Sequence, residues 1–193
     1  MITSREIYYD YLNQDRKALG WQNISFKDRL KMIFAPDYIL NFQSLLRKVE
    51  YYENSKKNIF EQVYYYFLRL KYKRLSVKLG LTIPLNVFGP GLSIVHYGTI
   101  IINMKTKVGK NCRIHACTNI GASGGTKEAP TIGDNVYIAP GAKIYGNITI
   151  ANNIAIGANA VVNKSFEEEG IFIAGNPAQK IKKIDIKKII THI

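Results

Sequence analysis

Three histidines, His96, His115 and His192, are the residues of this sequence best suited to acid–base chemistry. Unperturbed imidazole titrates near pH ~6.5, so a histidine can take a proton from a hydroxyl group at neutral pH. His115 directly follows the apolar Ile114, which places it at a turn of the repeat described below, where it could line a groove. His192 lies in the C-terminal tail and is expected to be solvated. A zinc site needs about three histidines in one place, so we expect no metal.

An apolar residue at every sixth position organises the second half of the chain. Neither a helix, with a period of about 3.6, nor a strand, with a period of about two, keeps this spacing. A six-residue period predicts a prism with three short strands per coil, each sending one aliphatic side chain to the axis. Positions 120, 114, 108 and 102 keep the register, but the preceding ones fall on His96 and two prolines. The repeat positions are Ile132, Ile138, Ile144, Ile150, Ile156 and Val162.

The patterns divide the chain into three parts. Residues 1–80 carry apolar side chains at helical spacing and are predicted to form an α-helical region. Residues 81–175 are predicted to form the hexapeptide-repeat β-helix, with an external loop near 121–131, because GASGGTKEAP has no aliphatic residue at Thr126. Residues 176–193 are predicted to form a turn and a basic helical tail. The predicted fold class is therefore mainly β, with an N-terminal α-helical region and a short C-terminal helix.

The composition favours a protein with an anionic partner. There are 27 Lys and Arg residues against 14 Asp and Glu, a net charge of +13 over 193 residues. A phosphate-rich cofactor, an acidic membrane surface or nucleic acid could supply the negative charge, but helical periodicity explains the interleaved aromatic residues and argues against nucleic acid. No apolar run of about eighteen residues and no signal pattern is present, so we expect a cytoplasmic protein. Cys112 and Cys117 are expected to be packed, reduced thiols.

The prism, the GASGG loop and the C-terminal motif AGNPAQKI together resemble the hexapeptide acyltransferases of left-handed β-helix fold, over residues 80–183. The segment IPLNVFGPGLSIVHYGTIIIN is similar to the first coils of serine acetyltransferases. The resemblance implies acetyl-CoA as co-substrate, a homotrimer, and an active site in the groove between neighbouring prisms. Many proteins of this branch acetylate sugars of surface polysaccharides.

The same resemblance assigns roles to individual residues. His96, within the motif IVHYG, stands where the family has its catalytic histidine and is predicted to be the general base. Small residues along the coil edges would let the pantetheine arm approach the backbone, and cations after the Pro177 turn would hold the phosphates. The predicted coenzyme A contacts are Gly121, Ala122, Ala139, Gly157, Ala158, Pro177, Lys180, Lys182 and Lys183.

The sequence departs from serine acetyltransferases in the predicted acceptor site. Leu81 and Val95 stand where that family has two aspartates, and Glu128 replaces an arginine that grips the serine carboxylate. These changes favour a sugar of a surface polysaccharide or its precursor over serine. What orients His96 is left open between a backbone carbonyl and Glu128. The residues expected to hold acceptor hydroxyls are His115, Asn103, Asn119, Tyr97 and Glu128.

Two other functions fit the sequence. The first is a serine O-acetyltransferase of cysteine biosynthesis with unusual binding residues. The second is a non-catalytic trimeric β-helix scaffold, in which His96 would be dispensable and acetyl-CoA would not bind. The tyrosines interleaved with lysines in the helical region would also suit peripheral association with the inner face of the cytoplasmic membrane.

Overall fold

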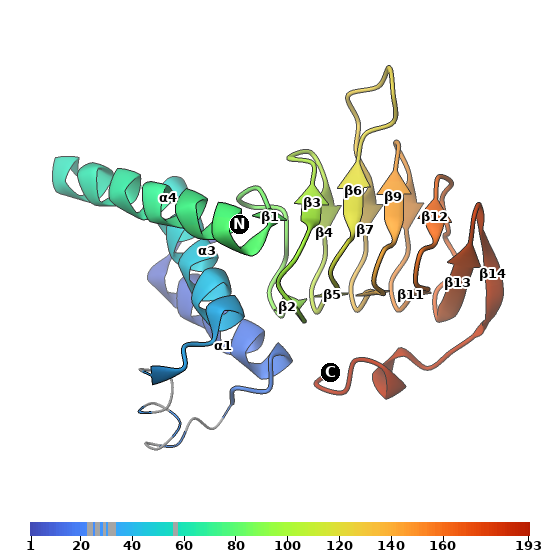
Figure 1. Ribbon diagram of the computed structural model, residues 1–193, viewed down its shortest axis with the longest axis horizontal. Coiled ribbons are helices and arrows are strands. Elements are labelled where there is room, and N and C mark those ends of the chain that lie inside the picture. Colours follow the sequence, from blue (N-terminus) through green and yellow to red (C-terminus); the bar gives the residue numbers. More distant parts are fainter. Residues whose placement is uncertain (23–24, 26–27, 29, 31–33, 56–57) are drawn as a thin grey trace.

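The computed structural model describes residues 1–193 except 23–24, 26–27, 29, 31–33 and 56–57 (Figure 1). Its N-terminal part is helical, and the described helices begin at side chains that accept hydrogen bonds from free backbone N–H groups. Asn58 and Glu61, for example, form a reciprocal capping box. None of the described helices is long and apolar enough to cross a membrane. The helices are α1 (Arg5–Ala18), α3 (Tyr38–Asn54) and α4 (Ile59–Leu79).

A left-handed parallel β-helix follows these helices, which confirms the predicted fold class. Figure 1 shows its coils stacked away from the helical region. The strands of these coils form three sheets, which are the three faces of the prism. Face A consists of β1 (Leu81–Thr82), β3 (Ile100–Ile102), β6 (Asn119–Gly121), β9 (Lys143–Tyr145) and β12 (Val161–Val162). Face B consists of β4 (Lys107–Val108), β7 (Thr131–Ile132) and β10 (Thr149–Ile150). Face C consists of β2 (Ser93–Ile94), β5 (Arg113–Ile114), β8 (Tyr137–Ile138), β11 (Ala155–Ile156), β13 (Ile171–Gly175) and β14 (Ala178–Lys183).

The axis of the prism is filled by the repeat residues, and the six positions from Ile132 to Val162 are each at most 2% exposed. Core positions also continue before Ile102, but the six-residue spacing is interrupted. Ile94 on face C and Ile102 on face A are equivalent positions of successive faces, and they are eight residues apart (102 − 94) instead of six. The two additional residues lengthen the corner at 95–99. His96, which falls on the six-residue spacing in the sequence, is therefore exposed at that corner and not in the core.

A ladder of asparagines stabilises the corner between faces B and C. Asn111, Asn135 and Asn153 have φ angles of 55°, 56° and 59°, a left-handed conformation that asparagine tolerates better than most residues. Asn111 Nδ2 donates to Asn135 Oδ1 at 2.9 Å, and Asn135 Nδ2 donates to Asn153 Oδ1 at 2.9 Å. Asn153 Nδ2 donates to Glu169 at 3.1 Å. The ladder therefore links four successive coils along one corner.

Asn135→Ala is expected to destabilise the protein by about 2–4 kcal/mol. The variant loses two ladder hydrogen bonds, and alanine tolerates the positive φ angle of this position less well than asparagine does. Asn135→Gly removes the same hydrogen bonds but keeps an unstrained backbone. Urea unfolding of both variants measures the difference. If the glycine variant were as unstable as the alanine variant, backbone strain at positive φ would not contribute to the loss of stability.

The C-terminal segment differs from the predicted helical tail. Residues 178–183 form β14, which runs antiparallel to β13, and only a 3₁₀ turn, η1 (Ile186–Lys188), is helical. The last coil of the prism would otherwise leave the edge of β13 unpaired, and β14 pairs with this edge. Ile186 and Ile190 then pack on the outer side of face C around Ala155. The basic residues of this segment consequently lie on a strand and its following turn.

A buried ion cluster joins the helical region to the prism. Arg47 of α3 is fully buried, and its guanidinium binds Asp15 of α1 at 2.8 Å and Glu50 at 2.9 Å. The same guanidinium donates to the carbonyl oxygens of Phe88 and Gly89 in the first coil, at 2.9 and 2.7 Å. Burial alone would lower the pKa of Arg47, but the two carboxylates outweigh it and raise the pKa. Arg47 therefore remains charged and connects three segments.

The two cysteines differ in environment. Cys112 is buried, and desolvation raises the pKa of its thiol to about 12, which makes it a packed, unreactive side chain. Cys117 is exposed at a turn with φ 63°, so the expectation of a packed thiol was wrong for this residue. Both are free thiols.

Candidate active site

Two of the three histidines meet at the corner between faces C and A. His96 follows β2 and His115 follows β5 in the next coil, so the stacking of coils brings them together across 19 positions of sequence (115 − 96). Their ring centroids are 6.2 Å apart. The ring of Tyr137, from the following coil, contacts His115 edge-on at 5.2 Å between centroids. This corner presents an exposed imidazole, His96, beside a half-buried one.

The environment of His115 favours its neutral form. Burial, followed by the positive charge of Arg113 and by His96, lowers the pKa of His115. Its Nε2 atom is shielded from solvent and has no hydrogen-bond partner among the described residues. A neutral imidazole with an unsatisfied nitrogen is suited to hydrogen bonding with an acceptor hydroxyl. The acceptor role of His115 stays a prediction.

None of the described side chains forms a hydrogen bond with His96. Leu81, at the first of the two aspartate positions, is 2% exposed and belongs to the core of the prism. Glu128, one of the two candidates for orienting His96, lies beside Lys105 instead, with 3.3 Å between its Oε1 and Lys105 Nζ. Within one chain, Glu128 is thus engaged away from His96.

The predicted coenzyme contacts fall on two different corners. Ala139 and Gly157 follow β8 and β11 at the corner of His96, whereas Gly121 ends β6 at the corner between faces A and B. A Cβ at Gly157 would lie 2.8 Å from Ala174 Cβ, so coil packing alone already requires glycine there. A Cβ at Gly121 would meet only Asn119 Oδ1, at 3.5 Å, which leaves the position open to an approaching ligand. Ala122 and Ala158 follow Gly121 and Gly157 directly in the chain.

The predicted phosphate-binding lysines lie on β14. Pro177 is in the turn between β13 and β14. Lys180 already binds Glu168, with 2.7 Å between Nζ and Oε1, so part of its charge is neutralised. Lys182 and Lys183 are exposed and remain available for anionic groups.

The predicted acceptor residues also separate into two groups. Tyr97 is exposed next to His96 and shares its corner with His115. Asn103 and Glu128 lie at the corner between faces A and B, where Asn103 Oδ1 accepts from Lys105 N at 2.9 Å. Asn119 lies in the strand β6 of face A and is half-buried. One chain alone therefore does not bring all the predicted residues to one place.

Sequence reasoning missed Tyr137 as a neighbour of the histidines. It precedes the repeat residue Ile138 and so projects outward from face C, where it stacks above Arg113 in the strand register. The six-residue period could have predicted this neighbour, because residues that directly precede core positions on one face lie above one another in successive coils. The external loop lengthens one coil, so the sequence spacing between Arg113 and Tyr137 does not show that they are neighbours.

Comparisons with known proteins agree with this fold. Residues 129–164 match the family of the bacterial transferase hexapeptide (six repeats). The serine acetyltransferase of Staphylococcus xylosus is 39% identical over 97 residues, which are 49% of this chain and 44% of the relative. That of Mycobacterium tuberculosis is 38% identical over 100 residues, 51% of this chain and 43% of the relative. The chain thus spans less than half the length of these relatives.

Solved structures extend the likeness to the helical region. Serine acetyltransferase of Neisseria gonorrhoeae superposes with a TM-score of 0.70 at 24% identity, covering 93% of this chain and 68% of that one. A serine acetyltransferase in complex with CoA gives a TM-score of 0.67 at 21% identity, covering 92% and 71%. Residues 129–164 therefore carry the repeat of the bacterial hexapeptide transferases, on a left-handed β-helix. Within that class, the similar proteins are serine acetyltransferases.

The prediction of a sugar acceptor was wrong. The similar curated sequences are serine acetyltransferases, which favours the serine alternative. The prediction rested on the aspartates missing at Leu81 and Val95 and on Glu128 in place of an arginine. A missing contact weakens one mode of recognition, but it supplies no contact for a different acceptor.

Proposed function

We propose that this protein is an acetyl-CoA-dependent serine O-acetyltransferase. The observation that carries the proposal is the exposed His96 beside His115 at a corner of the prism, in a chain that is 37–39% identical to serine acetyltransferases over about half its length. Transfer of an acetyl group to a hydroxyl requires a base at the hydroxyl and donors for the oxyanion. A non-catalytic scaffold requires neither.

In the proposed reaction, His96 takes the proton of the serine hydroxyl while the hydroxyl oxygen attacks the carbonyl carbon of the thioester. The carbon–sulfur bond then breaks, and the coenzyme A thiolate receives the proton from the imidazolium. Backbone N–H groups near Gly121 are suited to hold the oxyanion, because the space beside this glycine is open. Ala139 and Gly157 would flank the pantetheine arm, and Lys182 and Lys183 would face the phosphates.

Serine recognition needs opposite charges, and an exposed ion pair beside the external loop offers them. Lys105 and Glu128 lie 3.3 Å apart at the edge of the external loop. Lys105 could bind the serine carboxylate and Glu128 the serine ammonium group, which reverses the arrangement expected from the resemblance. Glu128 would take the part of the amine-binding aspartate, and Lys105 that of the arginine that grips the carboxylate.

A homotrimer would unite the two corners. In a groove between two prisms, the corner of His96 from one subunit can face the corner of Gly121, Lys105 and Glu128 from the next. The exposed apolar side chains of α4, among them Phe60 and Phe67 at 82% and 60%, are available for further subunit packing. We place this assembly in the cytoplasm, where acetyl-CoA is available.

Release of free coenzyme A thiol from acetyl-CoA tests the proposal. L-serine is expected to support release, whereas L-serinamide, which lacks the carboxylate, and 3-hydroxypropionate, which lacks the ammonium group, are expected to react at least about tenfold less efficiently. Lys105→Gln should reduce the difference in catalytic efficiency between serine and serinamide. Glu128→Gln should reduce the difference in catalytic efficiency between serine and 3-hydroxypropionate. Lys164→Gln, on another part of the prism, is the control. No thiol release with serine and no binding of acetyl-CoA would support the scaffold instead.

A further inference from the structure

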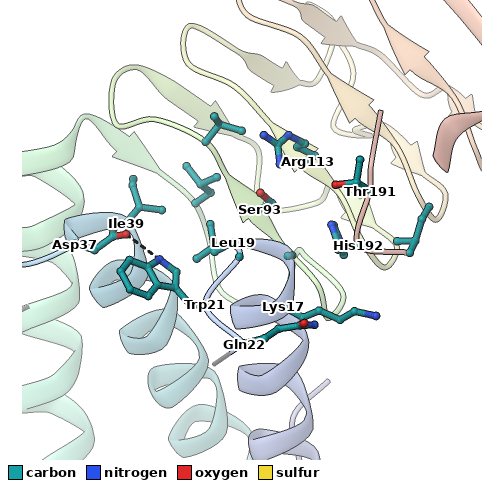
Figure 2. Close-up of a pocket in the computed structure, with 15 residues that line it drawn as sticks. Lys17, Leu19, Trp21, Gln22, Asp37, Ile39, Ser93, Arg113, Thr191 and His192 are labelled. Atoms are coloured by element: carbon teal, nitrogen blue, oxygen red, sulfur yellow. Dashed lines mark hydrogen bonds between the residues drawn. The ribbon is translucent and has the colours of Figure 1, made fainter. Parts of the chain in front are cut away.

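A cavity of about 760 Å³ lies between the helical region and the prism. Figure 2 shows its walls: the C-terminal end of α1, the N-terminal end of α3, the strands β2 and β5, and the last residues of the chain. Small-molecule sites in proteins commonly measure about 300–1,000 Å³. Neither His96 nor His115 lines this cavity, so the proposed reaction does not account for it.

Basic side chains from three separate elements converge on the cavity, and two of them, Lys17 and Arg113, are positively charged at neutral pH. Lys17 comes from the end of α1, Arg113 from β5, and His192 from the C-terminal tail (Figure 2). Neither Lys17 nor Arg113 forms an ion pair with any residue that the structure describes. The carboxylate of Asp37 also lines the cavity, but it accepts hydrogen bonds from Trp21 Nε1 at 3.1 Å and from the backbone N of Leu40 at 2.9 Å. Lys17 and Arg113 are therefore not paired with Asp37, whose carboxylate lies beside Trp21 (Figure 2).

His192 adds an unsatisfied polar atom to the cavity. Its Nε2 is shielded from solvent and has no hydrogen-bond partner among the described residues. Burial lowers the pKa of His192, and the charges of Lys17 and Arg113 lower it further. A shielded polar atom without a partner is costly, and a bound ligand would satisfy it.

The opposite side of the cavity combines apolar side chains with the carboxylate of Asp37. Trp21, Leu19 and Ile39 line it, and Figure 2 shows the indole of Trp21 across the cavity from Arg113 and His192. The hydrogen bond to Asp37 fixes the edge of the indole, which leaves its ring available for an apolar or flat group. A matching ligand would carry a negative charge at one end and an apolar group at the other.

We propose that this cavity binds a small organic anion, with its phosphate or carboxylate group at Lys17, Arg113 and His192 and its apolar part against Trp21. Arg113 offers a planar guanidinium suited to two oxygens of the anion, Lys17 a point charge, and His192 an additional nitrogen. None of the residues proposed for acetyl transfer lines this site, although Val95, next to His96, and Arg113, near His115, belong to its wall.

Fluorescence titration can test the site directly, because Trp21 is the only tryptophan of the chain. The probes are phenyl phosphate, inorganic phosphate and phenol at constant ionic strength, with calorimetric titration in parallel. Phenyl phosphate is expected to bind saturably and to change the Trp21 emission, inorganic phosphate to bind more weakly, and phenol not to bind. Arg113→Gln and Lys17→Gln should each weaken phenyl phosphate binding by about tenfold or more.

Matched controls separate the site from general charge attraction. Arg74→Gln and Lys71→Gln remove exposed cations of α4 and should leave the affinity unchanged. Equal affinities for phenyl phosphate in all four variants would overturn the proposal. So would the absence of any saturable change in Trp21 emission with phenyl phosphate or inorganic phosphate beyond the change caused by chloride. Because Lys17 is exposed, its variant is expected to fold even if Arg113→Gln does not. The readout is binding, so its result is independent of acetyl transfer.

Discussion

His96→Ala is expected to lower kcat for acetyl transfer to serine by about 10²–10⁴-fold, the usual contribution of a positioned general base. The imidazole is exposed at the corner between faces C and A, so its loss should leave the fold intact. The affinity for acetyl-CoA should change little, because the proposed coenzyme contacts belong to other residues. Thiol release measured at saturating acetyl-CoA, together with coenzyme binding by calorimetry, checks both statements.

His115→Gln is the matched comparison for this result. His115 lies 6.2 Å from His96 between ring centroids but is proposed to bind the acceptor, so its variant should raise KM for serine more than it lowers kcat. The assignment of the base would be refuted if His115→Gln lost kcat and His96→Ala kept it. Unchanged thermal midpoints for both variants would exclude unfolding as the cause.

Arg47→Ala is expected to destabilise the protein by about 3–5 kcal/mol, because it leaves the buried carboxylates of Asp15 and Glu50 without their cation. Typical domains are stable by only about 5–15 kcal/mol, so the variant should be largely unfolded at moderate urea concentrations. Urea titration followed by circular dichroism measures the change.

The exposed pair Arg69–Glu53 provides the control for Arg47. Its charged atoms are 3.7 Å apart and both side chains are solvent-accessible, so Arg69→Ala should cost no more than about 1 kcal/mol. If the two variants lost a similar amount of stability, burial of the ion cluster would not explain the effect of Arg47→Ala.

Replacing the whole cluster by apolar residues should not restore stability, although such replacements are often tolerated elsewhere. Asp15 also accepts a hydrogen bond from Leu92 N at 2.9 Å, and Glu50 accepts one from Asn86 N at 2.7 Å. With the carbonyls of Phe88 and Gly89, four backbone groups of the first coil would lose their partners (Asn86 N, Leu92 N, Phe88 O, Gly89 O). The cluster is thus part of how the helices hold the first coil.

The sequence by itself determined the architecture of the prism. A six-residue spacing of Ile and Val is compatible with a chain that turns after each short strand, and the core positions from Ile102 onward follow it. Helical spacing likewise predicted the helices before Gly80. These properties depend on local periodicity, which the order of residues records directly. The resemblance also identified His96, because the motif around it is continuous in sequence.

Only the tertiary structure decided how distant segments combine. Two extra residues between Ile94 and Ile102 move His96 out of the core, and the edge of the last coil turns residues 178–183 into a strand. Asp15 and Arg47, 32 positions apart, form one ion cluster, and Lys17, Arg113 and His192 meet at one cavity. Such contacts depend on which surfaces pack together and which polar groups burial leaves to be satisfied, and no local pattern in the sequence records either.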